Sequence, residues 1–99
     1  MKTIKHYVEA LEEELESAKE YAEKYVERKA NDDTHAANMY KEMATDELKH
    51  TSYIHEFAVK EIQKISNVYT APIEMQEKWD KAHKEYVEKS AWIRQMLAM

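Results

Sequence analysis

The sequence contains no cysteine and no glycine, and Pro72 is its only proline. A chain without cysteine has no disulfide, no thiolate zinc site, no iron–sulfur cluster and no cysteine nucleophile. Glycine and proline both weaken helix interiors, so their scarcity is typical of an all-helical chain. We therefore expect an all-α fold in which any metal ligand is a glutamate, an aspartate or a histidine.

Hydrophobic runs long enough to span a membrane and clusters of basic residues are also absent. The N-terminal stretch "MKTIKHYVEALEEELE" becomes acidic too early for a signal peptide. The chain carries 15 basic and 20 acidic residues, a formal net charge of −5, which disfavours nucleic acid and anionic membranes as partners. We expect a soluble, cytoplasmic protein.

Large aliphatic side chains are few. Only 16 of the 99 residues are Leu, Ile, Val or Phe, and seven Tyr, two Trp and six Met supply much of the other apolar surface. The length suits a single domain, residues 1–99, with room for three helices. Because such a core is thin for an isolated three-helix unit, we expect burial against a second copy, in a homodimer or larger even oligomer.

The periodicity of the apolar residues predicts three helices, roughly over residues 3–30, 34–66 and 72–97. The stretch "NDDT" at residues 31–34 ends the first helix and offers side-chain oxygens that can cap the second. The stretch "SNVYTAP" breaks the pattern again, and its final residue, Pro72, suits the first turn of the third helix.

Each of the first two helices has one apolar face when residues are placed about 100° apart around the axis. The predicted buried face of the first helix holds Ile4, Tyr7, Val8, Leu11, Leu15, Ala18, Tyr21, Ala22, Tyr25 and Val26. The predicted buried face of the second holds Ala36, Met39, Tyr40, Met43, Ala44, Ile54, Phe57, Ala58, Ile62 and Ile65. Glu14 lies within the first face, and Glu47, His50 and Glu61 lie within the second. An ionised carboxylate in a helix interface costs several kcal/mol without a partner, so these groups need compensation.

A shared metal ion is one such compensation. Glu47 and His50 can contact one ion, because residues i and i+3 lie about 60° apart around a helix and about 4.5 Å apart along it. Glu14 can approach from the antiparallel first helix, since packed helices lie about 8–10 Å apart. A twofold partner would raise the total to four carboxylates and two imidazoles around two ions. Such a carboxylate-rich set favours iron or manganese over a structural zinc site.

The stretches "EEELESAKEYAEKYVERK" and "AANMYKEMATDELKH" resemble the first helix pair of the ferritin-like di-iron carboxylate proteins, and the rubrerythrins most of all. In that family a helix-one glutamate precedes a tyrosine by seven residues, as Glu14 precedes Tyr21. The second helix carries Glu-x-x-His, matched by Glu47 and His50, and the two glutamates are 33 residues apart. Small and aromatic core residues precede this motif, as Ala37, Tyr40 and Ala44 do here. The resemblance covers about half of the chain.

Full-length family members have a second helix pair with its own ligands, which this chain lacks. Short encapsulin-associated ferritins resemble this half-chain and build the site across a dimer. The resemblance therefore implies a ferritin-like four-helix bundle formed by a homodimer, with two iron ions, or manganese, at its centre. It implies that Glu14 and Glu47 are ligands and bridges, that His50 is a terminal ligand, and that Tyr21 donates a hydrogen bond beside the metals. The implied chemistry is ferroxidase- or peroxidase-type: oxidation of ferrous iron or reduction of oxygen or peroxide.

Two alternatives remain open at this stage. The polar residues could form a buried cluster that fixes helix register in a metal-free helical dimer with a structural or adaptor role. The same residues could instead hold a hydrolytic or structural zinc ion.

Other polar residues are assigned separately. Glu61 lies about 21 Å along the helix from Glu47, too far to join its site. Asp80 and His83 have the i, i+3 spacing of an accessory metal site. Three further histidines, His6, His35 and His55, are expected at the surface. On the third helix, Trp92 is expected to be exposed, which suggests a contact surface.

Overall fold

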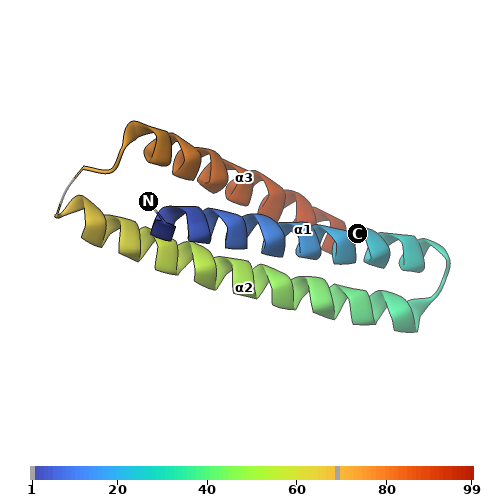
Figure 1. Cartoon of the computed structure of the whole chain (residues 1–99). Coiled ribbons are helices and arrows are strands. Elements are labelled where there is room, and N and C mark those ends of the chain that lie inside the picture. The colour runs from blue at the N-terminus through green and yellow to red at the C-terminus, as the bar shows by residue number, and fades with distance from the viewer. Residues whose placement is uncertain (1, 69) are drawn as a thin grey trace.

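Three helices account for almost the whole chain. The computed structural model describes residues 2–68 and 70–99, with side chains from residue 4 onward. Helix α1 spans Lys2–Ala30, α2 spans Thr34–Ser66 and α3 spans Ile73–Leu97 (Figure 1). The prediction of an all-helical chain with three helices is confirmed for these residues, and each bound lies within one residue of the expected one. Tyr69, in the predicted break before α3, lies outside the described residues.

The turn between α1 and α2 is built from the acidic residues that the sequence places there. Asp32 adopts a left-handed backbone conformation, with φ of 59°, which aspartate tolerates better than most residues. Asp33 caps α2, because its side chain accepts a hydrogen bond of 3.3 Å from the backbone amide of Ala36. Arg28 lies 3.6 Å from the Asp33 carboxylate and so ties the end of α1 to this cap.

Pro72 lies one residue before α3 rather than in its first turn, which corrects the sequence prediction. Its backbone is extended, with φ of −55° and ψ of 143°, so it occupies the cap position. The Pro72 carbonyl accepts backbone hydrogen bonds from Met75 and Gln76. The pyrrolidine ring fixes φ at a value that suits either position, so the sequence alone did not decide between them.

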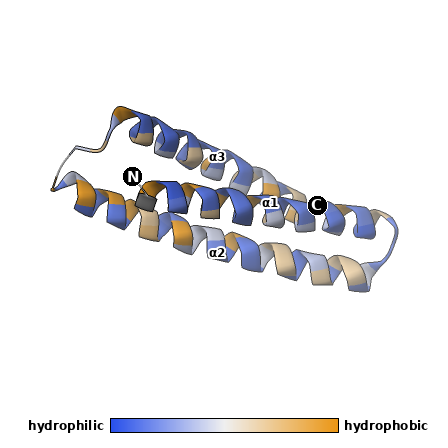
Figure 2. Cartoon of the chain, viewed as in Figure 1, coloured by the Kyte–Doolittle hydropathy of each residue, from blue (hydrophilic) through white to orange (hydrophobic). Residues whose placement is uncertain are grey.

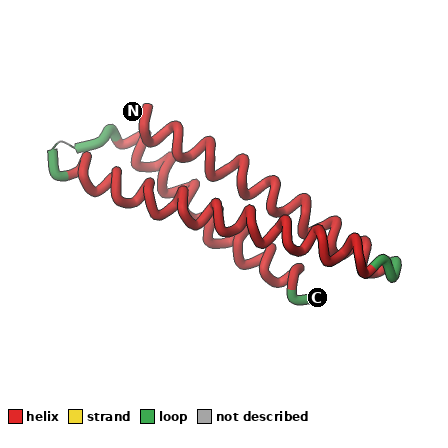
Figure 3. Tube along the Cα trace, turned by 90° about the horizontal axis from the view of Figure 1, so that it is seen from below, coloured by secondary structure: helices red, strands yellow, loops and turns green. Residues whose placement is uncertain are grey.

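Helix α1 is the central element of an elongated bundle. It packs along α2 on one side and along α3 on another, whereas α2 and α3 touch each other at few places (Figures 1 and 3). The molecule measures 55 × 18 × 17 Å and has a radius of gyration of 15.9 Å, against about 13 Å for a compact domain of this length. Among the described residues, no helix has the length and hydrophobicity needed to cross a bilayer.

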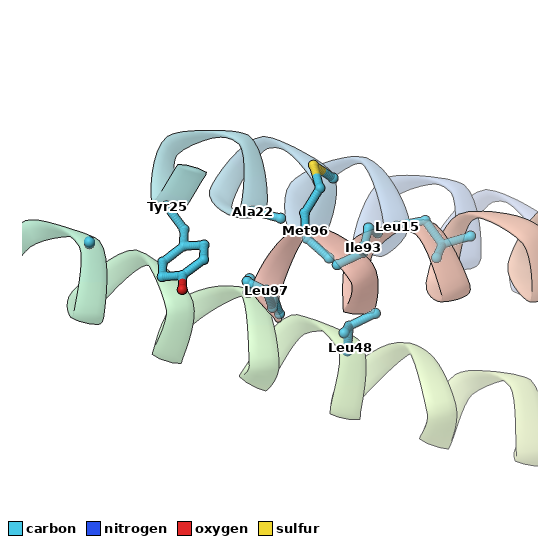
Figure 4. Packing of buried hydrophobic residues seen from close by; sticks show 10 residues of the cluster. Leu15, Ala22, Tyr25, Leu48, Ile93, Met96 and Leu97 are labelled. Atoms are coloured by element: carbon cyan, nitrogen blue, oxygen red, sulfur yellow. The ribbon is translucent and has the colours of Figure 1, made fainter. Parts of the chain in front are cut away.

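The main hydrophobic core lies where all three helices meet. Helix α1 contributes Leu15, Ala22 and Tyr25 to this core, and α2 contributes Leu48 (Figure 4). Helix α3 contributes Ile93, Met96 and Leu97. A smaller cluster at the other end joins α1 to α3 through Ile4, Val8 and Ala82. The predicted buried face of α1 agrees with this packing, since seven of its members are buried: Ile4, Val8, Leu11, Leu15, Ala18, Ala22 and Tyr25.

The buried face of α2 differs from the prediction. Met39 and Phe57, expected in the core, are 47% and 62% exposed. Two members of the predicted face, Ala44 and Ala58, are buried as expected, whereas Ala37, Leu48 and Thr51 are buried although they were not assigned to it. The apolar stripe of α2 is wider than the surface that α1 and α3 cover, so one flank of it remains open, and Figure 2 shows hydrophobic residues recurring along this helix. Val87 of α3 is likewise exposed.

Candidate metal centre

Glu14, Glu47 and His50 lie together at the middle of the α1–α2 pair. The Nδ1 atom of His50 is 3.8 Å from Glu14 Oε2 and 3.8 Å from Glu47 Oε1. One ligand atom from each of the three residues lies within 4.8 Å of the other two. The antiparallel packing of α1 and α2 therefore brings together the residues that the sequence singled out. Among the described residues, this is the one group of three or more potential ligands with such spacing.

The carboxylates of this cluster are only partly solvated. The side chains of Glu14 and Glu47 are 32% and 23% exposed, whereas His50 is 55% exposed and lies at the rim rather than in the interior. Glu14 Oε2 is buried and accepts no hydrogen bond when both carboxyl groups are ionised. Only protonation of Glu47 would supply a hydrogen bond within the pair. A buried oxygen without a partner is costly, and a cation would supply the partner.

The Glu14 carboxyl group strongly perturbs the titration of Glu47. Hydrogen bonding with the Glu14 carboxyl group, burial and the negative charge of Glu14 raise the pKa of Glu47 from 4.5 to about 7, while His50 opposes this shift. The cause is the proximity of two like charges in a partly dry site, where both cannot ionise freely. A divalent cation would relieve this repulsion, because it stabilises both ionised carboxylates at once.

The stability of the metal-free protein should fall as pH rises from 4.5 to about 7, because the folded chain holds the Glu47 proton to higher pH than the unfolded chain. Unfolding then releases a proton across this range, so the free energy of unfolding declines there and is constant outside it as far as this group is concerned. We expect a loss of about 1 kcal/mol, reduced for partial exposure, measured by thermal melts at several pH values. Glu47→Gln should remove this pH dependence of the free energy of unfolding, and the control Glu61→Gln should keep it. The same pH dependence in the wild type and in Glu47→Gln would show that Glu47 is not its source.

An open face adjoins the cluster on the side of α2 away from α3. Met39, Tyr53 and Phe57 are 47%, 57% and 62% exposed, and they project within about 60° of His50 around the helix. These four residues define the open face. On α1, the small residues Ala10 and Ser17 lie within about 60° of Glu14 on the same side, and both are half-buried.

Helix α3 lies beside the opposite flank of α2 and touches it at few places. The groove between these helices is lined by Leu48 and Ser52 of α2 and by Arg94 and Leu97 of α3. On α2 these lining residues lie more than about 90° around the axis from Glu47, on the other side from Phe57. The cluster is therefore not enclosed by the third helix of its own chain.

Tyr21 is not part of this three-residue cluster. It lies two turns along α1 from Glu14, is half-buried, and stacks against Tyr40 of α2 with ring centroids 6.3 Å apart. Its hydrogen-bonding role stays a prediction. Glu61 is paired with Lys64 at 3.3 Å near the end of α2, in agreement with its predicted exclusion from the site.

The accessory site expected at Asp80 and His83 stays a prediction, and His83 makes a contact that was not expected. His83 contacts His55 of α2, with Nε2 of His55 and Nδ1 of His83 separated by 2.8 Å. His55 is half-buried rather than a surface residue. No sequence pattern indicates this contact, because it depends on how α3 is placed against α2.

Comparison with protein-family models, with curated proteins and with solved structures finds no match for this chain.

Proposed function

We propose that this chain is a ferritin-like di-metal protein, with iron as the expected metal and a site shared across a homodimer. The observation that carries the proposal is the Glu14–Glu47–His50 cluster, in which the three potential ligand atoms lie within 4.8 Å of one another. The orphaned Glu14 Oε2 and the raised pKa of Glu47, about 7, both support a cation between the carboxyl groups. Oxygen-rich ligands with one imidazole suit iron or manganese.

A second copy of the chain would complete the site. The three groups of one chain leave a two-metal centre half built, and the open face beside them exposes Met39, Tyr53 and Phe57. A twofold interface places the same face of both copies together, so each apolar side chain is buried twice. The small residues Ala10 and Ser17 would allow helices to approach closely at Glu14. Two α1–α2 pairs would then form a four-helix bundle with four carboxylates and two imidazoles inside it.

The residues fit roles in ferrous-iron oxidation or in oxygen or peroxide reduction. Two bound ferrous ions would supply two electrons to the oxidant. Glu14 and Glu47 would hold both ions and balance their charge, and His50 would add a neutral ligand from the rim. The apolar side chains of the open face would keep bulk water from the carboxylates, which strengthens their attraction to the metal. Tyr21, on the same side of α1 as Glu14, would serve as a hydrogen-bond donor near the oxidant.

The rival is a metal-free helical dimer with a structural role. It is favoured by the hydrogen bonding between the carboxyl groups, since a pKa of about 7 leaves Glu47 about half protonated at pH 7 and mostly neutral below it, without a cation. In that case the cluster would fix the register of two helices rather than bind metal.

Iron content and native mass, measured together, test the proposal. The protein is loaded anaerobically with ferrous iron, desalted, and analysed for iron per chain and for mass by light scattering. We expect about one iron per chain in a dimer or larger even assembly. Glu47→Ala should lose this iron, whereas Glu61→Ala, which removes a carboxylate near the end of the same helix, should retain it.

Three results would count against the proposal. Failure to bind iron, manganese or zinc would favour the metal-free dimer. Binding of zinc alone, without a redox response, would favour a hydrolytic or structural zinc site. Full iron binding by a stable monomer would show that the site does not need a second copy.

A further inference from the structure

A pair of histidines joins α2 to α3 outside the candidate metal centre. Nε2 of His55 and Nδ1 of His83 are 2.8 Å apart. His55 lies five residues beyond His50 on α2 and about 140° around the axis, so it faces a different side of the helix. Helix α3 packs mainly against α1, which makes this pair one of the few links between α3 and α2.

Aromatic rings hold the pair in place. The ring of His55 stacks on Trp79, with centroids 5.6 Å apart, and its centroid is 4.2 Å from that of Tyr86. Tyr86 is anchored in turn by a 3.3 Å hydrogen bond between its hydroxyl group and that of Ser52. The contacts with Trp79 and Tyr86 limit the motion of the His55 ring. His83 is exposed, so the pair is open to solvent from the α3 side.

His55 has the protonation state that a metal ligand needs. Burial and the neighbouring His83 hold the pKa of His55 below its usual 6.5, so this imidazole is neutral at pH 7 and above. In the contact itself, one ring nitrogen donates a proton and the other accepts it. Transfer of that proton to the far nitrogen of the donor ring, by exchange with water, leaves a lone pair on both facing nitrogens without a change in charge.

We propose that His55 and His83 form a second metal site that takes a late first-row divalent cation, of the Cu²⁺, Ni²⁺ and Zn²⁺ class, and clasps α3 to α2. At the roughly 90° angle of a square-planar or octahedral ion such as Cu²⁺ or Ni²⁺, two nitrogens about 2.0–2.1 Å from the metal lie about 2.9 Å apart, close to the observed 2.8 Å. The tetrahedral angle of Zn²⁺ requires a slightly wider separation, about 3.3 Å. The pair supplies two protein ligands, and water completes the coordination. Neutral imidazoles suit these metals, whereas the carboxylate-rich cluster at Glu47 suits harder ions.

Trp79 provides a direct probe, because it stacks on His55. In a Trp92→Phe background, Trp79 is the sole tryptophan, and Cu²⁺ bound at the pair should quench its fluorescence. We expect saturable quenching at pH 7.5 with about one Cu²⁺ per chain at this site. His83→Asn should raise the half-saturating Cu²⁺ concentration at least about tenfold, because it removes one of two ligands. Since His83 is exposed, this substitution should leave the helical circular dichroism unchanged.

Two controls separate this site from the proposed function. His35→Asn changes an exposed histidine outside the pair and should leave the Cu²⁺ titration unaltered. His83→Asn should keep full ferrous-iron loading at the Glu47 cluster. The proposed site is refuted if the Cu²⁺ titration of His83→Asn matches that of the parent protein. It is also refuted if quenching of Trp79 rises without saturation in both proteins. Loss of quenching in Glu47→Ala but not in His83→Asn would place the copper at the Glu14–Glu47–His50 cluster and would equally refute a site at His55 and His83.

Discussion

Phe57→Glu should convert the proposed dimer to a monomer and abolish the proposed binding of iron. The Phe57 side chain is 62% exposed in the single chain, so the substitution should cost little folding stability. In the proposed dimer the same position lies against the partner, and a twofold axis would bury the new charge twice. Burial of unpaired carboxylates costs several kcal/mol, so we expect the dimer dissociation constant to rise at least about 100-fold. Analytical ultracentrifugation measures the assembly, and elemental analysis measures the iron.

Val87→Glu is the matched control, since Val87 is similarly exposed on α3 but lies outside the open face. It should leave both the mass and the iron content unchanged. A Phe57→Glu protein that stays dimeric would show that the open face is not the interface. A monomeric variant that still binds about one iron per chain would show that the half-site suffices by itself.

Glu14→Leu should stabilise the metal-free protein and abolish its stabilisation by metal. The substitution replaces a partly buried carboxylate, whose Oε2 lacks a hydrogen bond, with an apolar side chain in an apolar face. Exchanges of this kind often add about 1–2 kcal/mol. The wild type should gain about 3–4 kcal/mol from Mn²⁺ at 100–1,000 times its dissociation constant, and the variant should gain almost none. Differential scanning calorimetry with and without redox-silent Mn²⁺ would reveal both effects as shifts of several degrees.

Glu13→Leu controls for the change in charge, because Glu13 is the exposed neighbour of Glu14 on α1. It should preserve the gain from Mn²⁺. Retention of that gain in Glu14→Leu would exclude Glu14 as a ligand. Absence of any gain in the wild type with Mn²⁺, ferrous iron or zinc would favour the metal-free dimer, for which a more stable Glu14→Leu is the only expected effect.

Local features of the sequence were sufficient to predict the helices. The cap at Asp33 and the break before Pro72 are short-range signals, and the seven buried residues of α1 follow from periodicity alone. The convergence of Glu14 on Glu47 and His50 was also predictable, because two helices joined by a tight turn pack antiparallel and their registers are then fixed.

The remaining features depend on tertiary contacts that periodicity does not encode. The stripe of α2 shows which side is apolar but not what covers it, so Met39 and Phe57 were assigned to the core of a chain that leaves them exposed. His50 lies at the rim for the same reason. The contact between His55 and His83 requires the position of α3 relative to α2, which is set by core packing at Ile93 and Leu97 far along the chain.

The central position of α1 gives the molecule an uneven resistance to local opening. Separation of α3 would leave the contacts between α1 and α2 in place, whereas separation of α1 would break the packing contacts of both α2 and α3. Backbone amides of α1 should therefore exchange with solvent deuterium more slowly than those of α3, as expected for cooperative units of different stability. Glu14, Glu47 and His50 all belong to the α1–α2 hairpin, which should be more stable than α3. The three side chains should therefore stay together during local unfolding events in which α3 separates from the hairpin.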